Sequence, residues 1–239
     1  MWWIIPVVIV VILLLALIIG FAIWLIKEHE KGDYGDGGGQ FFGGNNDVPF
    51  FSSRQERAGV WGEEVANFHL RPLLRNDEYL IANLLFPLKN GHSSEVDCVM
   101  ISRKGIFCIE VKKWVGHISG ADNDEYWLQE YDDPSLDDRK HFNPVMQNQN
   151  HCRIIERALH KEYKVNNIVV FVRLEDGCGI ESNHAYTLSE FKECYRKLNE
   201  NALDEGDLTY IFEILKAYIA SEKDLNVYKD KRNKENTDH

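Results

Sequence analysis

The sequence predicts an α/β domain, with helices flanking one central mixed sheet, preceded by one N-terminal transmembrane helix. Three observations support this prediction. An uncharged apolar stretch opens the chain, short apolar segments of strand composition follow, and helices with clear start signals alternate with one further strand. The order helix, several strands, helix, strand and helices is typical of α/β sandwiches built around one sheet.

Residues 1–26 contain no charged side chain and are almost wholly apolar. A hydrocarbon core about 30 Å thick needs roughly 20 such residues in a helix, so this stretch can span a membrane. A cleaved signal peptide is the alternative, but it needs a basic start and a small-residue cleavage site, and neither is evident. Lys27 and Lys31 follow the span and no Lys or Arg precedes it. We therefore expect a single-pass membrane protein whose C-terminal domain is cytoplasmic.

The rest of the chain divides into three parts by composition. Seven of the 17 glycines lie between Gly32 and Gly44, so we expect residues 27–53 to form a flexible linker. Residues 54–221 carry the apolar periodicity of a folded domain, and residues 222–239 form a charged C-terminal tail.

Periodicity and start signals place the elements of this domain. Asn143 is a suitable N-cap and Pro144 suits the first turn of a helix that runs to about Leu159. A polar loop with an acidic run is expected after Trp127. The other expected elements are helices over 54–74, 188–199 and 206–221 and strands over 78–88, 94–102, 105–113, 116–120 and 167–172.

Charge and cysteine content narrow the possible functions. The net charge of −11 argues against a protein that coats nucleic acid through a broad basic surface. It still permits an enzyme that meets phosphates at one metal site. The five cysteines form no CxxC, and Cys98 and Cys108 lie in apolar runs, as reduced core thiols do.

The segment 93–114 carries the strongest chemical signal. Two apolar runs flank Arg103, Lys104 and Gly105, which suit a tight hairpin turn. With Arg103 and Lys104 as the loop, the register places Asp97 opposite Glu110. The same register pairs Ser102 with Gly105 and Glu95 with Lys112.

The strand period of two then sorts the side chains of this hairpin onto two faces. Glu95, Asp97, Glu110 and Lys112 share one face. The other face receives an apolar set suited to a core: Val96, Cys98, Met100, Phe107, Ile109 and Val111. Two facing carboxylates need a compensating charge, which a lysine and a hard divalent cation can supply together. An exposed strand edge with ion pairs would produce the same pattern.

Further segments resemble the nuclease-related domain (NERD) family, which is related to restriction-endonuclease-like nucleases of the PD-(D/E)xK type. The resemblance covers about residues 57–175. The segments that carry it, in this order, are Gly59-Val60-Trp61-Gly62-Glu63, Glu95-Val96-Asp97, residues 105–112, residues 116–120, Trp127 and Asn143-Pro144-Val145-Met146-Gln147.

This resemblance implies a restriction-endonuclease-like central sheet and a role for each of five residues. Glu63, Asp97 and Glu110 would bind Mg²⁺ or Mn²⁺, Lys112 would be the catalytic lysine, and Gln147 would be an accessory polar residue. Helical spacing does not choose between Glu63 and Glu64, and the resemblance favours Glu63. The sequence departs from the family at two positions: Glu95 stands where Gln is more common, and Lys113 where Asn is common.

Two functions follow as alternatives. The first is a membrane-anchored, metal-dependent nuclease whose partner is nucleic acid, DNA in preference to RNA. The second is a catalytically inactive, membrane-anchored module that binds nucleic acid or a protein partner. The histidines do not follow a known metal-ligand spacing and are interpreted as structural or exposed; they include His92, His117, His141 and His151. The oligomeric state is not indicated.

Overall fold

The structure, a computed structural model, describes residues 40–42, 66–89, 91–174, 177, 179–221, 223–228 and 230. The predicted membrane span at residues 1–26, most of the predicted linker and the predicted ligand Glu63 lie outside these residues. Among the helices of the described part, none is both long enough and apolar enough to cross a membrane.

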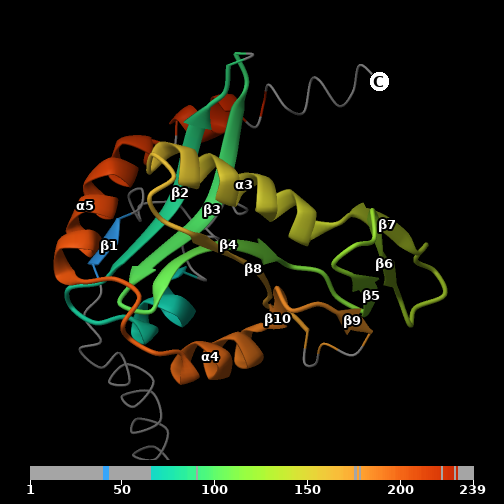
Figure 1. Cartoon of the computed structure of the whole chain (residues 1–239). Helices are drawn as coiled ribbons and strands as arrows, with labels where there is room; N and C mark the ends of the chain where they lie inside the picture. The colour runs from blue at the N-terminus through green and yellow to red at the C-terminus, as the bar shows by residue number, and fades with distance from the viewer. Residues whose placement is uncertain are drawn as a thin grey trace, which may run out of the picture. The chain divides into compact units, whose positions relative to one another are not determined.

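A six-stranded mixed sheet forms the centre of the domain (Figure 1). Strands β2, β3 and β4 form an antiparallel meander, while β1 pairs parallel with β2, β8 with β4, and β10 with β8. The order across the sheet is β1 (Gln40–Phe42), β2 (Tyr79–Pro87), β3 (Ser93–Ser102), β4 (Gly105–Lys112), β8 (Val165–Phe171) and β10 (Ala185–Thr187). Four of these strands confirm the predicted ones, whereas β1 and β10 were not predicted.

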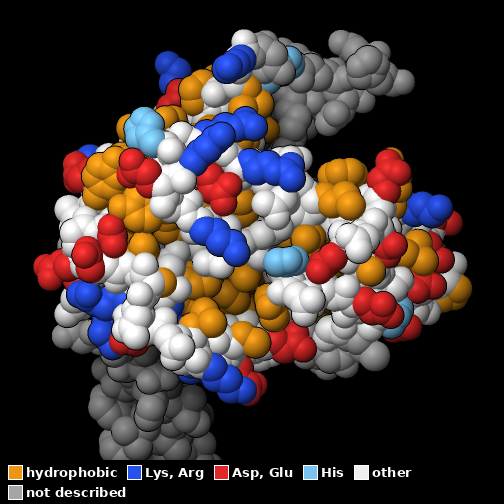
Figure 2. All heavy atoms as spheres, viewed as in Figure 1, with side chains coloured by type: hydrophobic (Ala, Val, Ile, Leu, Met, Phe, Trp, Pro, Cys, Tyr) orange, Lys and Arg blue, Asp and Glu red, His pale blue; other side chains and the backbone are white. Residues whose placement is uncertain are grey.

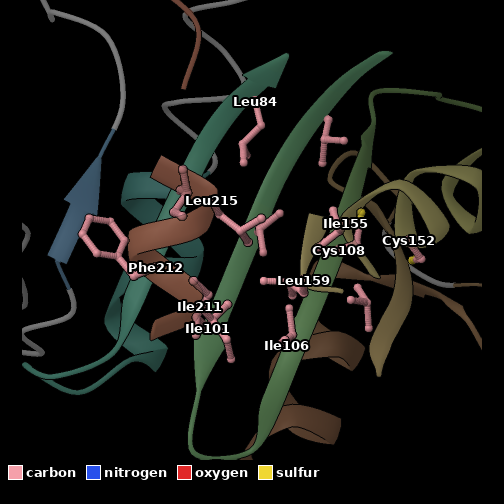
Figure 3. Close-up of a cluster of buried hydrophobic side chains, with 14 of the residues drawn as sticks. Leu84, Ile101, Ile106, Cys108, Cys152, Ile155, Leu159, Ile211, Phe212 and Leu215 are labelled. Atoms are coloured by element: carbon pink, nitrogen blue, oxygen red, sulfur yellow. The ribbon is translucent and has the colours of Figure 1, made fainter. Parts of the chain in front are cut away.

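Helices cover both faces of this sheet. On one face lie α3 (Pro144–Ala158) and α5 (Glu205–Leu215), which pack on a buried cluster that includes Ile101, Cys108 and Ile155 (Figure 3). On the other face lie α4 (Leu188–Lys197) and the short turns η1 (Ala66–Leu70) and η2 (Arg71–Leu73). The described cysteines are unpaired, and the thiols of Cys98 and Cys108 are buried as predicted.

Local capping explains where these helices begin. The side chain of Asn143 accepts the backbone N–H groups of Val145 and Met146, and Pro144 opens α3, as predicted. Capping boxes start the other two helices: Thr187 with Glu190 begins α4, and Asp204 with Asp207 begins α5. The predicted last helix ends earlier than expected, at Leu215, and continues as the 3-10 turn η3 (Lys216–Tyr218).

A second, four-stranded sheet corrects the prediction of one central sheet. Its order is β7 (Arg139–Phe142), β6 (Tyr126–Glu130), β5 (His117–Ala121) and β9 (Ile180–Glu181). Only β5 was predicted as a strand, because β6 and β7 are short and rich in polar residues. The fully buried indole of Trp127 joins this sheet to Phe171 at the end of β8, with the rings 6.1 Å apart.

Strands β2 and β3 both change the face they present at one position. Their ladder is interrupted at Asn83 and Asp97, and Asn83 has a left-handed φ of 58°. Such a residue breaks the period-two alternation of a strand. As a result Val96 packs with Leu84 in the cluster beneath α3 and α5, while Cys98 packs on the opposite face. The prediction that Val96 shares a face with Cys98 was therefore wrong.

Candidate active site between strands β3 and β4

Strands β3 and β4 separate at the position of the two predicted carboxylates. Their ladder runs from Ser102 opposite Gly105 to Cys98 opposite Ile109, which confirms the predicted register over this length. Beyond it, β3 stays paired with β2, and β4 stays paired with β8 (Figure 1). We call this separation the fork. The predicted cross-strand pairs beyond Cys98 are not ladder pairs, because the strands have already diverged.

Asp97 is the first residue of β3 beyond the ladder. Its Oδ2 accepts the backbone N–H of Val111 at 2.9 Å, so the carboxylate replaces a ladder bond that the fork has removed. Burial, followed by the charge of Glu110, raises the pKa of Asp97 to about 7, against the lowering effects of the Val111 N–H and of Lys112. The charge at this position is therefore poorly compensated by the described residues.

Glu110 lies across the fork on β4, and its side chain is only 6% exposed. Its Oε1 accepts hydrogen bonds from Lys112 Nζ at 2.6 Å and from Gln147 Nε2 at 2.9 Å. Its Oε2 lies 3.4 Å from Nδ1 of His151. Burial alone would raise the pKa of Glu110, but the neighbouring His151 and Lys112 outweigh burial and hold this pKa below its usual value.

Helix α3 brings the remaining polar groups to the fork. Gln147 and His151 lie four residues apart, on one face of the helix. Gln147 Oε1 accepts a second hydrogen bond from Lys112 Nζ at 3.1 Å, which fixes the ammonium between Glu110 and Gln147. His151 Nδ1 is buried and has no well-aligned hydrogen bond within the described part of the chain.

A buried amide docks α3 on the sheet. Asn148 is fully buried, and its Nδ2 donates to the carbonyl oxygens of Cys108 and Ile168 at 2.9 Å and to Asn167 Oδ1 at 2.7 Å. These bonds tie the helix to β4 and β8 at once. The position of Gln147, the preceding residue, is thereby fixed relative to Glu110.

An aromatic wall borders the fork on the side of the second sheet. The ring of Trp114 stacks on His141, with centroids 4.1 Å apart, and Lys112 Nζ lies 5.8 Å from the Trp114 centroid. His141 Nε2 lies 2.8 Å from Oε1 of the buried Gln129. Burial, then the charges of Lys112 and Arg139, lower the pKa of His141.

The structure brings together four of the five predicted site residues: Asp97, Glu110, Lys112 and Gln147. The fifth, Glu63, lies outside the described residues. Sequence reasoning missed the site position of His151, although its spacing of four residues from Gln147 was visible.

The donors at the fork suit a hard divalent cation. Within the part of the chain that the structure describes, no three His, Cys, Asp or Glu side chains are grouped so as to hold a metal ion. The carboxylates of Asp97 and Glu110 are nevertheless the kind of ligand that Mg²⁺ uses, one or two at a time, with water and phosphate oxygens completing its shell. The poorly compensated charge of Asp97 fits such an ion.

Two carboxylates on diverging strands, with a lysine two residues after the second, are consistent with a PD-(D/E)xK-like site. The comparison with family models agrees: residues 58–172 match the nuclease-related domain (NERD). This part of the chain belongs to the NERD family.

Comparison with whole proteins adds one relative. An uncharacterized protein of Bacillus anthracis is 22% identical to this chain over 191 residues, which cover 74% of this chain and 86% of the relative. No solved structure matches the chain.

Proposed function

We propose that the chain is a membrane-anchored, metal-dependent nuclease that hydrolyses phosphodiester bonds of nucleic acid, with DNA expected ahead of RNA as the partner. One observation carries the proposal: Lys112 Nζ is held between Glu110 and Gln147 at the fork, across from Asp97. A structural ion pair would not require a helix to supply a second acceptor for the same ammonium.

The side chains at the fork have separable tasks in this proposal. Asp97 and Glu110 would hold Mg²⁺ or Mn²⁺, with Glu63 as a further ligand. Once bound, the ion would polarise a phosphoryl group as a Lewis acid. Gln147 orients Lys112, whose ammonium can position the attacking water or stabilise negative charge that develops during hydrolysis.

The activity is tested on the full-length chain in non-ionic detergent. Single- and double-stranded DNA and RNA are incubated with Mg²⁺, Mn²⁺ or EDTA. We expect metal-dependent cleavage that falls by about 100-fold or more in Lys112→Ala. Asp97→Ala is expected to be inactive, and Lys113→Ala, an exposed neighbour, serves as the matched control. Absence of cleavage on every substrate refutes the enzyme, and equal activity in all variants indicates a contaminant.

The membrane anchor is the second part of the proposal. Residues 1–26 would span the membrane and leave the C-terminal domain in the cytoplasm. Protease treatment of intact cells tests this orientation, because a cytoplasmic domain is protected. Digestion of the domain from outside would refute it.

The acidic composition favours a second candidate, a catalytically inactive module that binds nucleic acid or a protein. The net charge of −11 and the charge of Glu95, which adds to the rise of the Asp97 pKa, both oppose the approach of phosphate. Nucleic-acid binding that persists without cleavage under every metal condition would select this candidate.

A further inference from the structure

A hollow of about 510 Å³ lies at the C-terminal end of α3. Four cationic side chains line it together with two glutamates and Tyr163; the cations are Arg153, Arg157, Lys161 and Lys164. We call it the α3 hollow. Figure 2 shows Lys and Arg side chains gathered over the helix that Figure 1 labels α3.

The cations of the α3 hollow outnumber its carboxylates by four to two. Arg157, Lys161 and Lys164 are exposed, and none forms an ion pair with a carboxylate of the described residues. Glu156, whose Oε1 accepts the backbone N–H of Val165 at 3.2 Å, and Glu162 are both carboxylates, so the six charged side chains leave the hollow with a positive formal charge. Local positive charge on a chain with a net charge of −11 indicates a site for an anion.

The α3 hollow and the fork share one rigid element. Gln147 and His151 of α3 contact the fork residues, and Arg157 belongs to the last turn of the same helix. At 1.5 Å of rise per residue, Arg157 lies roughly 9 Å along the axis from His151 and roughly 15 Å from Gln147. Duplex DNA advances 3.4 Å per base pair, so these two separations correspond to about three to four base pairs.

We propose that the α3 hollow binds the phosphodiester backbone of the nucleic acid, about three to four base pairs from the bond presented to the fork. This inference rests on the proposed function and adds the path of the substrate along α3. Arg153 and Arg157 lie four residues apart on one stripe of the helix, and Lys161 and Lys164 line the same hollow from the turn that follows the helix. Backbone phosphates, which are contacted by Arg and Lys side chains in nucleic-acid complexes, suit a group of cations of this kind.

A simpler role for these cations makes a different prediction. Cations near the C-terminus of a helix offset its dipole, and Arg157 stands in the last turn of α3. That role affects the stability of the protein and leaves its affinity for nucleic acid unchanged. It also requires no hollow.

The test measures binding apart from cleavage. The full-length chain in non-ionic detergent is titrated into a fluorescent 20-base-pair DNA duplex in EDTA, at several salt concentrations, and anisotropy is recorded. For wild type, log K falls linearly with log salt. We expect Arg157→Gln and Lys161→Gln each to weaken binding and to reduce the slope by about 0.9, the value for one lost phosphate contact.

Lys197→Gln is the matched control, because it removes one exposed cation from α4, on the opposite face of the sheet. Equal slopes for wild type and both hollow variants overturn the proposal, as does a loss of slope of the same size in Lys197→Gln. Absence of duplex binding by wild type, with hollow-dependent binding to phosphatidylserine vesicles, also overturns it in favour of a lipid-binding site. If the hollow variants change only the urea midpoint of unfolding and bind DNA like wild type, the cations act only on the helix dipole and the proposal is overturned.

The experiments distinguish a refuted cleavage activity from a refuted nucleic-acid contact at the α3 hollow. If no metal supports cleavage but Arg157→Gln reduces the slope, the enzyme is refuted and the nucleic-acid contact stands. If Lys112→Ala abolishes cleavage while the hollow variants bind like wild type, the enzyme stands and the α3 hollow is refuted.

Discussion

Replacing Asp97 with Asn tests the electrostatics of the fork directly. Asn retains an oxygen that can accept the Val111 N–H, so the geometry is largely conserved, while the negative charge is removed. In the metal-free protein this charge lies close to Glu110 in a poorly hydrated position, which is why the pKa of Asp97 is raised to about 7. We therefore expect Asp97→Asn to stabilise the metal-free protein at neutral pH.

The size and the pH range of this effect follow from the pKa. A rise from 3.8 to about 7 in the folded state is worth at most about 4 kcal/mol, since each unit corresponds to about 1.36 kcal/mol. Because the folded-state pKa exceeds the unfolded-state value, the contribution of Asp97 to stability is full below about pH 4. It is lost as the pH rises through about 7. The amide of the substituted asparagine does not titrate, so the variant escapes this loss.

Urea denaturation in EDTA, followed by tryptophan fluorescence and circular dichroism, measures the effect from pH 4 to pH 8. The difference in unfolding free energy between Asp97→Asn and wild type should be near zero at pH 4 and grow with pH. Adding Mn²⁺ should stabilise wild type and leave the variant unchanged, because the ligand is missing. A difference that is independent of pH, or a variant less stable than wild type at pH 8, would refute the reasoning.

Three further predictions concern the supports of the fork and of the second sheet. Asn148→Ala should lower the unfolding free energy by about 2–4 kcal/mol, because it leaves buried carbonyl groups unpaired. The exposed control Asn150→Ala should change this free energy by no more than about 0.5 kcal/mol, and an equal loss in both variants would contradict the docking role of Asn148. Gly120→Ala would place Cβ 2.4 Å from Cγ of Trp127, so we expect the unfolding free energy to fall by about 2 kcal/mol or more. The near-ultraviolet circular dichroism spectrum should also change, and an unchanged spectrum would count against this packing. His151→Ala should lower the affinity for Mn²⁺, measured by calorimetry, by about 10- to 100-fold, while the helix content stays unchanged. An unchanged affinity would show that the His151 ring does not support Glu110.

Local rules were enough to predict the hairpin that carries the site. The tight turn at Arg103 and Lys104 sets the register of β3 and β4, and the period of two then places Asp97 and Glu110 near each other. The nearby turn makes this prediction reliable, because only a short length of chain separates the two strands.

Features that depend on distant contacts were not predictable in the same way. The face adopted by Val96 depends on the left-handed backbone of Asn83, which no hydrophobic pattern encodes. The strands β6 and β7 are too short and too polar to show alternation. In the sequence, Asn148 does not differ from other polar helical residues, because its docking role depends on contacts with the distant strands β4 and β8.

The β2–β3 hairpin beyond the fork is braced by residues 218–220, which follow α5. Asn83 accepts the backbone N–H of Ala220, Leu84 forms an isolated bridge with Ile219, and the ring of Phe86 stacks on Tyr218. Asp97 belongs to this hairpin, whereas Glu110 belongs to the β4–β8 pair. The strand that carries Asp97 is therefore supported by a segment more than 100 residues away in the sequence. A chain truncated before residue 216 would keep all the described site residues yet lose this support.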